Sequence, residues 1–147
     1  MNLRPVTKAD EQQWQGLWQK YNCFYDRPFF SPEITQVTWA RFFDDAEPMY
    51  ALVAEQHGQL VGLAHYLFHR STTRIELSCY LQDLYVSEAS RGHGIGRQLI
   101  EAVDQMAKAA GTKRVYWQTK EDNHAARKLY DKIAKHLGFI VYSQDLE

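Results

Sequence analysis

A glycine-rich segment in the middle of the chain has the residue types and spacing of an anion-binding turn. It reads Arg91-Gly92-His93-Gly94-Ile95-Gly96 and lies between an apolar stretch and a region of helical periodicity. The first N–H groups of a helix have no partner inside the helix, and the helix dipole favours negative charge there. Glycines let a phosphate approach the backbone without meeting a Cβ. Two flanking arginines, Arg91 and Arg97, can add charge-assisted hydrogen bonds.

Two other glycine motifs do not fit this segment. A dinucleotide-binding fold has Gly-x-Gly-x-x-Gly near the start of a βαβ unit. Here the glycines stand at alternate positions, 92, 94 and 96, after four expected strands. The phosphate loop of nucleotide hydrolases requires Gly-Lys-Ser/Thr, which this sequence lacks. The plain alternative is a glycine-rich loop that only enters a helix, but Arg91 and the strand before it favour phosphate binding.

The apolar periodicity predicts the elements that position this turn. We expect helices up to about residue 21, from Ser31 towards residue 44, from the glycines to Gly111, and from Asn123 to Gly138. We expect strands over residues 2–6, 49–54, 60–68, 74–86, 115–118 and 139–142. This order predicts a three-layer α/β/α arrangement with a mixed sheet, formed by residues 1–147 as a single domain.

Composition excludes several classes of protein. The chain has 147 residues, a net charge of -1 and 14% aromatic residues, which speaks against a disordered chain or a general polyanion binder. It contains neither a run of ~20 apolar residues nor an N-terminal apolar leader, so we expect no membrane partner. Its two cysteines, Cys23 and Cys79, are expected to be buried or half-buried thiols of a cytoplasmic protein.

Two blocks of the sequence resemble the GNAT superfamily of acetyl-CoA-dependent N-acetyltransferases. Residues 91–96 match its Arg/Gln-x-x-Gly-x-Gly/Ala signature, and residues 123–130 followed by Gly138-Phe139 resemble its Asn-x-x-Ala-x-x-Leu-Tyr…Gly-Phe block. The segment over residues 80–86 is similar to that of the histone, polyamine and D-amino-acid acetyltransferase branch. The resemblance implies a GNAT-like fold with a splayed central sheet, and transfer of an acetyl group from acetyl-CoA to a primary amine.

The resemblance also implies how the cofactor binds. The diphosphate of acetyl-CoA, and of the product coenzyme A, is expected on the amides of residues 92–97. The pantetheine arm is expected to run along the strand that ends at Leu84-Tyr85-Val86, like an added strand. That strand must splay from residues 115–118, commonly with a bulge. The implied cofactor-binding residues are Leu84, Tyr85, Val86, Arg91, Gly92, His93, Gly94, Ile95, Gly96, Arg97, Asn123 and Ala126.

The resemblance assigns an acid more clearly than a base. Tyr130 stands at the family's Leu-Tyr position, where a phenol can protonate the departing thiolate. The sequence alone favours a packing residue there, and the resemblance reverses that preference. The related polyamine enzymes carry Glu where this chain has Gln82, which accepts no proton at neutral pH. Asp83 is the nearest carboxylate, although strict strand alternation puts it on the opposite face from Gln82. Glu76, Asp26 and a water chain are the alternatives.

The acceptor amine is expected against the aromatic segment after the first helix. Its rings suit an aliphatic amine, and Asp26 with Arg27 would fit the two charges of an amino acid. About half of these rings can instead be explained as core between helices. The expected acceptor-binding residues are Tyr21, Tyr25, Asp26, Arg27, Tyr80 and Gln82.

No metal site is expected from the histidines. His65 and His69 are four residues apart on an expected strand, which is no helical ligand pair, and the other histidines are scattered. Histidines exposed to solvent or near phosphate are the expectation.

Partners and alternatives follow from the same features. The expected partner is a small-molecule or peptide amine, and the short last strand predicts a homodimer that covers an exposed sheet edge. One alternative is a non-catalytic acyl-CoA sensor of the same fold. The other is a nucleic-acid-binding module that would use four basic residues, although the balanced charge argues against it. These are Arg91, Arg97, Lys113 and Arg114.

Overall fold

The computed structural model describes residues 1–146 of the chain. Its contacts divide the chain into two compact units, residues 1–117 and residues 118–147. The larger unit holds the sheet, three helices and the glycine-rich turn. The smaller unit holds the last helix and the C-terminal segment, apart from Glu147, which lies outside the described residues.

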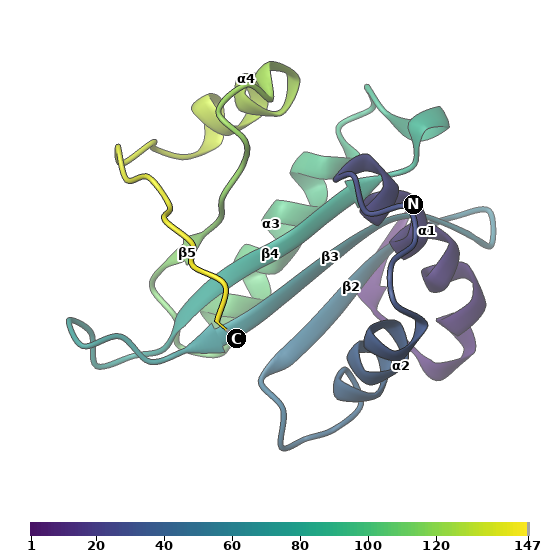
Figure 1. The fold of residues 1–147 in the computed structure, drawn as a ribbon, viewed down its shortest axis with the longest axis horizontal. Coiled ribbons are helices and arrows are strands. Elements are labelled where there is room, and N and C mark those ends of the chain that lie inside the picture. Colours follow the sequence, from purple (N-terminus) through teal and green to yellow (C-terminus); the bar gives the residue numbers. More distant parts are fainter. Residues whose placement is uncertain (147) are drawn as a thin grey trace. The chain divides into compact units, whose positions relative to one another are not determined.

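The larger unit is built on a five-stranded sheet (Figure 1), and its mixed character is as the sequence predicted. The first four strands pair antiparallel in chain order, and the fifth pairs parallel with the fourth. Short turns explain the antiparallel part, whereas the parallel pair requires a crossover helix. The strands are β1 (Asn2–Pro5), β2 (Met49–Gln56), β3 (Gln59–His69), β4 (Ser78–Val86) and β5 (Val115–Tyr116).

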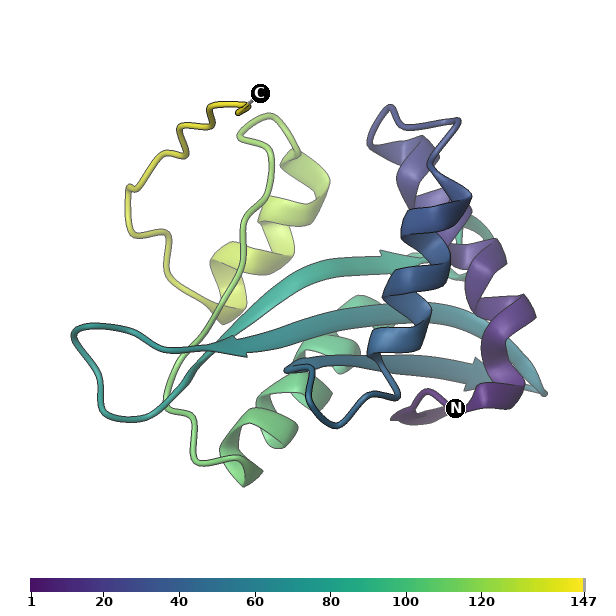
Figure 2. The same cartoon turned by 60° about the horizontal axis from the view of Figure 1, so that its bottom comes forward.

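Helices cover both faces of this sheet, which gives the three layers expected (Figure 2). On one face lie α1 (Glu11–Phe24) and α2 (Pro32–Arg41), whose tryptophans form a buried cluster with apolar side chains of the sheet. On the other lies α3 (Ile95–Ala109), which buries Leu99, Ile100 and Val103. Each helix presents its apolar stripe to the sheet. The helices therefore cover the apolar side chains that the strands carry on both faces of the sheet.

Local signals in the sequence set the ends of these helices. Before α1, Thr7 and Asp10 form a capping box. Asp10 also accepts two hydrogen bonds from Arg4, at 2.7 and 2.9 Å, which ties the helix entry to β1. At α2 the side chain of Ser31 accepts from the backbone N–H of Ile34, and Pro32 occupies the first helical position.

The glycine at position 62 allows α3 to sit close to the sheet. A Cβ there would lie 3.1 Å from the backbone oxygen of Tyr85 and 3.1 Å from Cδ1 of Leu99. A larger residue in β3 would therefore push the start of α3 away from β4. The glycine-rich turn between β4 and α3 depends on this close contact for its position.

Several predicted boundaries within the larger unit are wrong by a few residues. The long extended stretch begins as a strand only at Ser78, because residues 71–76 form turns in which Arg70 donates to the backbone oxygen of Ile75. β5 ends at Tyr116 rather than at residue 118. Of the two thiols expected to be buried or half-buried, Cys79 is buried, and burial raises its pKa to about 12, whereas Cys23 is exposed.

The smaller unit contains α4 (His124–Ile133) followed by an extended segment. The helix ends before the predicted Gly138 because Ala134 adopts an extended backbone. The predicted last strand, residues 139–142, is not formed within the described residues, where no neighbouring strand pairs with it. Its apolar side chains, Phe139, Ile140, Val141 and Tyr142, are exposed. A strand without a pairing partner has no stable ladder, which explains the difference.

Within residues 1–146 no helix combines the length and the apolar character that crossing a membrane requires.

Candidate active site

The glycine-rich turn has the backbone shape of an anion cradle. After β4 comes a short 3₁₀ turn (Glu88–Ser90), and then Gly92 and Gly94 at φ angles of +82° and +78°. These left-handed angles favour glycine. Gly94 is the N-cap of α3, so the free N–H groups of the helix begin at the turn. Open space surrounds the position of a Cβ on either glycine, so a ligand can approach the backbone there.

The charged side chains of this turn are engaged with the protein. Nε of Arg91 donates to the backbone oxygen of Val86 at 3.0 Å, and its guanidinium lies over the ring of Tyr85. Nε of Arg97 donates to Glu101 one turn along the helix, at the surface. Nδ1 of His93 lies 3.3 Å from the backbone oxygen of Ser90. Arg91 therefore fastens the turn to the end of β4, a role that the sequence did not indicate.

Within the larger unit, the outer edge of β4 is unpaired where the family resemblance implies a splayed strand. Among residues 1–146, β4 pairs with β5 only at Cys79–Val115 and Tyr80–Tyr116. Beyond Tyr80 no described strand of the larger unit pairs with this edge, although Leu84, Tyr85 and Val86 still pair with β3 on the inner side. The register against β3 shifts by one residue at Gln82, which is the expected bulge. An extended ligand can therefore bind this edge as an added strand.

The bulge lies beside Asp83. Strand alternation puts Asp83 and Tyr85 on one face, and both are buried beside Tyr21, whereas Gln82 is exposed. Asp83 and Gln82 both line one cavity next to the bulge. Asp83 is nearly buried, and it accepts a hydrogen bond from the hydroxyl of Tyr21 at 2.7 Å. Burial and the charge of Asp83 raise the pKa of Tyr21, so the phenol keeps its proton.

The cavity beside Asp83 has a volume of about 300 Å³, at the low end for small-molecule sites. Its wall brings together one acidic and one basic side chain, Asp83 and Arg27, among apolar surface. Nε of Arg27 donates to Oδ1 of the buried Asn22 at 2.9 Å, and its guanidinium packs against the rings of Tyr25 and Phe30. The apolar part of the wall includes Trp18, Phe30, Ile34, Phe42, Met49 and Leu67.

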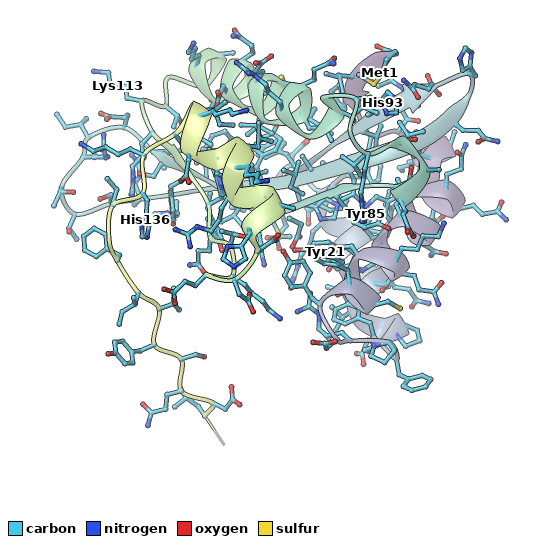
Figure 3. All side chains as sticks on the ribbon, turned by 90° about the horizontal axis from the view of Figure 1, so that it is seen from above. Met1, Tyr21, Tyr85, His93, Lys113 and His136 are labelled. Carbon is cyan, nitrogen blue, oxygen red and sulfur yellow. The ribbon has the colours of Figure 1, made fainter. Side chains whose placement is uncertain are left out.

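The cavity contains two of the six expected acceptor residues, Arg27 and Gln82. The others are outside its wall in the described residues. Tyr21 and Tyr85 lie side by side (Figure 3), with ring centroids 6.2 Å apart, and Tyr21 contacts Asp83. Tyr80 stacks on Tyr116. Asp26 is exposed, in a left-handed turn with φ of +60°, and does not line the cavity, whereas Asp83 and Arg27 do.

Three predicted residues lie in the smaller unit. The side chain of Asn123 accepts from the backbone N–H of Ala126 at 3.4 Å and so caps α4, a role for which asparagine is well suited. Tyr130 is half-buried on the same helix face as Ala126, Leu129 and Ile133. These four residues give α4 one partly buried face.

His65 lines the cavity beside Asp83, and the sequence did not predict it there. It was expected to be exposed or near phosphate, but it is buried, with Nδ1 2.9 Å from Oδ2 of Asp83. Strand alternation along residues 60–68, with Leu63 and His65 on one face, was the available signal. Within residues 1–146 no group of histidine, cysteine and acidic side chains has the arrangement of a metal site.

Comparison with known proteins identifies the family. The model of the acetyltransferase (GNAT) family matches residues 14–139, which is most of the chain. The chain belongs to the GNAT acetyltransferase family. It is therefore an acetyltransferase, and acetyl-CoA is the acyl donor that this family implies.

Individual relatives agree with this family. The chain is 38% identical to the D-amino-acid N-acetyltransferase HPA3 of Saccharomyces cerevisiae, over 99% of this chain and 93% of that protein. The crystal structure of a probable acetyltransferase superimposes with a TM-score of 0.85 at 22% identity, over 100% of this chain and 99% of the other. The aminoglycoside acetyltransferase AAC(6')-Iy, solved with a bisubstrate analogue, superimposes at 0.84 with 16% identity, over 99% and 97%. At these identities the two structures show the fold alone.

The residues of the larger unit fit coenzyme A. The cradle at Gly92 and Gly94 is open and faces the free amides of a helix, as a diphosphate requires. The open edge of β4 leads from this cradle to the bulge at Gln82. Both halves of an elongated ligand, an anionic end and an amide-bearing arm, therefore have matching groups on this chain.

Proposed function

We propose that the protein transfers the acetyl group of acetyl-CoA to the primary amine of a free amino acid. The observation that carries this proposal is the cavity shared by Asp83 and Arg27. A carboxylate and a guanidinium in one small cavity suit the ammonium and carboxylate of one amino acid. The activity that names the yeast relative, a D-amino-acid N-acetyltransferase, supports this acceptor over a polyamine, which carries no carboxylate.

In this proposal the larger unit prepares both reactants. When bound, acetyl-CoA supplies a thioester carbonyl that a neutral amine can attack. The amides of residues 92–97 bind its diphosphate, and the free edge of β4 orients its arm. An amine with a pKa of ~10 is mostly protonated at neutral pH, so it must lose a proton first. Asp83 takes that proton as general base, because it is the carboxylate in the cavity wall.

We propose Tyr130 as the general acid. A phenol with a pKa of ~10 keeps its proton at neutral pH and can donate it as the carbon–sulfur bond breaks. The support is the match of residues 123–130 to the family's Asn-x-x-Ala-x-x-Leu-Tyr block. We further propose direct transfer within a ternary complex. Initial rates at varied concentrations of both substrates should then give intersecting lines, whereas parallel lines would point to an acetylated enzyme.

An acceptor panel tests the amino-acid proposal. Each amino acid, in D and L form, is compared with the amine that lacks its carboxylate, and with spermidine. We expect kcat/KM to be about 100-fold higher for the amino acid, which corresponds to one charge-assisted pair in a partly dry site. Arg27→Met should remove this preference and leave the KM for acetyl-CoA unchanged. Arg41→Met, at an exposed arginine 3.9 Å from Glu47, is the matched control.

One outcome of the acceptor panel would contradict the amino-acid proposal. If spermidine is acetylated as well as any amino acid and Arg27→Met changes nothing, Arg27 binds no carboxylate and the acceptor is a plain amine.

The base assignment has its own test. Asp83→Asn keeps the size and hydrogen-bonding capacity of the side chain but takes up no proton. We expect kcat to fall by about 100- to 1,000-fold, within the usual range for a general base. Asp45→Asn, at an exposed aspartate in the same unit, should keep parental kcat. Parental turnover in Asp83→Asn would remove Asp83 from the mechanism.

We also propose a homodimer and a cytoplasmic location. Four exposed apolar side chains at residues 139–142 support the dimer, because pairing with a second copy would cover them. Light scattering at micromolar concentration should give twice the mass of one chain, and a monomer mass would contradict the dimer. Two unpaired cysteines support the location, which cell fractionation can check.

A further inference from the structure

Behind the carboxylate of Asp83 lies a buried chain of hydrogen bonds. Nε1 of Trp14 donates to Nε2 of His65 at 2.9 Å, and Nδ1 of His65 lies 2.9 Å from Oδ2 of Asp83. On the other carboxylate oxygen, the hydroxyl of Tyr21 donates at 2.7 Å. All four side chains are buried, and they come from three elements, α1, β3 and β4.

The donors along this chain fix the protonation of His65. The indole nitrogen of Trp14 carries a hydrogen and has no lone pair to offer, so it can only donate. Nε2 of His65 must therefore accept, which means that it carries no proton. A neutral imidazole with a bare Nε2 carries its hydrogen on Nδ1. His65 is thus the donor to Asp83, and the contact joins a neutral ring to a carboxylate.

Both oxygens of Asp83 then accept a hydrogen bond from a fixed donor. His65 donates to Oδ2 and Tyr21 donates to Oδ1, so the carboxylate plane is held from two sides. The ring of His65 is itself enclosed by three aromatic side chains. Its centroid lies 5.8 Å from Trp14, 5.1 Å from Trp18 and 4.8 Å from Phe42. A ring packed on several sides cannot turn to exchange its two nitrogens.

We propose that His65 is a positioning residue for Asp83, locked by Trp14 in the neutral Nδ1–H tautomer, and that it does not relay protons. A relay needs a proton acceptor beyond Nε2, but Trp14 presents an N–H there. The proton that Asp83 takes from the amine must leave through the cavity to water. This inference rests on the proposed role of Asp83 as general base.

The tautomer can be measured directly in the wild-type protein. Two-dimensional ¹H–¹⁵N spectra of ¹⁵N-histidine-labelled protein should show His65 with a slowly exchanging proton on Nδ1 and an unprotonated Nε2. The signal is assigned by its loss in His65→Asn. Trp14→Phe, which removes the indole N–H and keeps an aromatic ring, should broaden or shift the Nε2 signal. A protonated Nε2 in the wild-type protein would overturn the inference.

Kinetics test the positioning role. His65→Leu removes the donor and should lower kcat about tenfold, with the KM for acetyl-CoA unchanged, as misplacement of a base predicts. His65→Asn keeps an N–H near the place of Nδ1 and should recover most of that loss. Circular dichroism confirms that both variants fold. If kcat is as low in His65→Asn as in His65→Leu, His65 does not act by donating a hydrogen bond to Asp83.

A double-mutant cycle separates this inference from the proposed function. In the Asp83→Asn background, His65→Leu should cause no further loss of kcat, because its effect passes through Asp83. A full additional tenfold loss there would overturn the positioning role and leave the base assignment intact. Parental turnover in Asp83→Asn alone would instead overturn the base assignment, whatever tautomer His65 has.

Discussion

The glycine-rich turn and the acceptor cavity are two parts of one unit that are built in opposite ways. The turn is made of consecutive residues, and its binding groups are backbone amides set by Gly92 and Gly94. The cavity is made of side chains from α1, α2, β2, β3, β4 and the loop after α1. In the proposed function, the turn would bind the diphosphate that is the same in every reaction cycle, whereas single side chains of the cavity would decide which acceptor binds.

The same contrast decides what the sequence can predict. A helix N-terminus after alternating glycines is a local pattern, so the turn, the strand before it and α3 followed from the sequence. The partner of Asp83 did not, because His65 is 18 residues away and Trp14 is 51 residues from His65. The sheet register places His65 opposite Asp83, and the packing of α1 on the sheet brings Trp14 to His65. The family resemblance implied a bulge in this strand, but no local pattern of residues marks its position at Gln82.

The largest expected effect comes from a substitution that disrupts the glycine-rich turn and leaves the cavity unchanged. Gly94→Val adds a side chain at a left-handed position in the cradle. We expect coenzyme A to bind about 1,000-fold more weakly, a cost of about 4 kcal/mol, with parental binding of the acceptor. Isothermal titration calorimetry measures both.

Gly58→Val is the matched control for that variant. Gly58 has a φ of +77° and equally open surroundings, but it lies in the hairpin between β2 and β3. The Gly58→Val variant should lose about as much thermal stability as Gly94→Val but keep the parental affinity for coenzyme A. Equal loss of affinity in both variants would mean that strain, and not the cradle, explains Gly94→Val.

The next effect concerns the smaller unit. Tyr130→Phe removes only a hydroxyl, and we expect kcat to fall about 100-fold while the dissociation constant of coenzyme A stays within twofold. Stopped-flow or steady-state thiol release measures the rate. Tyr50→Phe, at a half-exposed tyrosine in β2, should behave as the parent. Turnover of Tyr130→Phe within a few-fold of the parent would contradict the acid assignment.

The smallest expected effect is on the stability of the fold alone, with no change at the glycine-rich turn or the cavity. The hydrogen bonds that the Arg4 guanidinium donates to the Asp10 carboxylate lower the pKa of Asp10 from 3.8 to about 2. The pair therefore stabilises the fold at pH values above about 4, and this contribution is lost as the pH falls from 4 through 2. Asp10→Asn should cost about 1 to 2 kcal/mol at pH 7 and flatten the acid limb of unfolding. Thermal melts from pH 2 to 7 give the curve, and the KM values should not change.

Local signals predicted α4 better than the segment after it. Asn123 caps the helix by an interaction within three residues, which its type and position already indicated. The strand expected over residues 139–142 depended on a partner, and sequence patterns do not show whether one is present. The same reason explains the short β5, because a strand ends where pairing ends.

The most direct test is an amide chemical-shift map of the ¹⁵N-labelled protein during titration with coenzyme A. The account predicts the largest shifts at the amides of residues 92–97, followed by the open edge of β4 between Leu81 and Val86. Unchanged amides in that turn at saturating coenzyme A, with the largest shifts elsewhere, would contradict it.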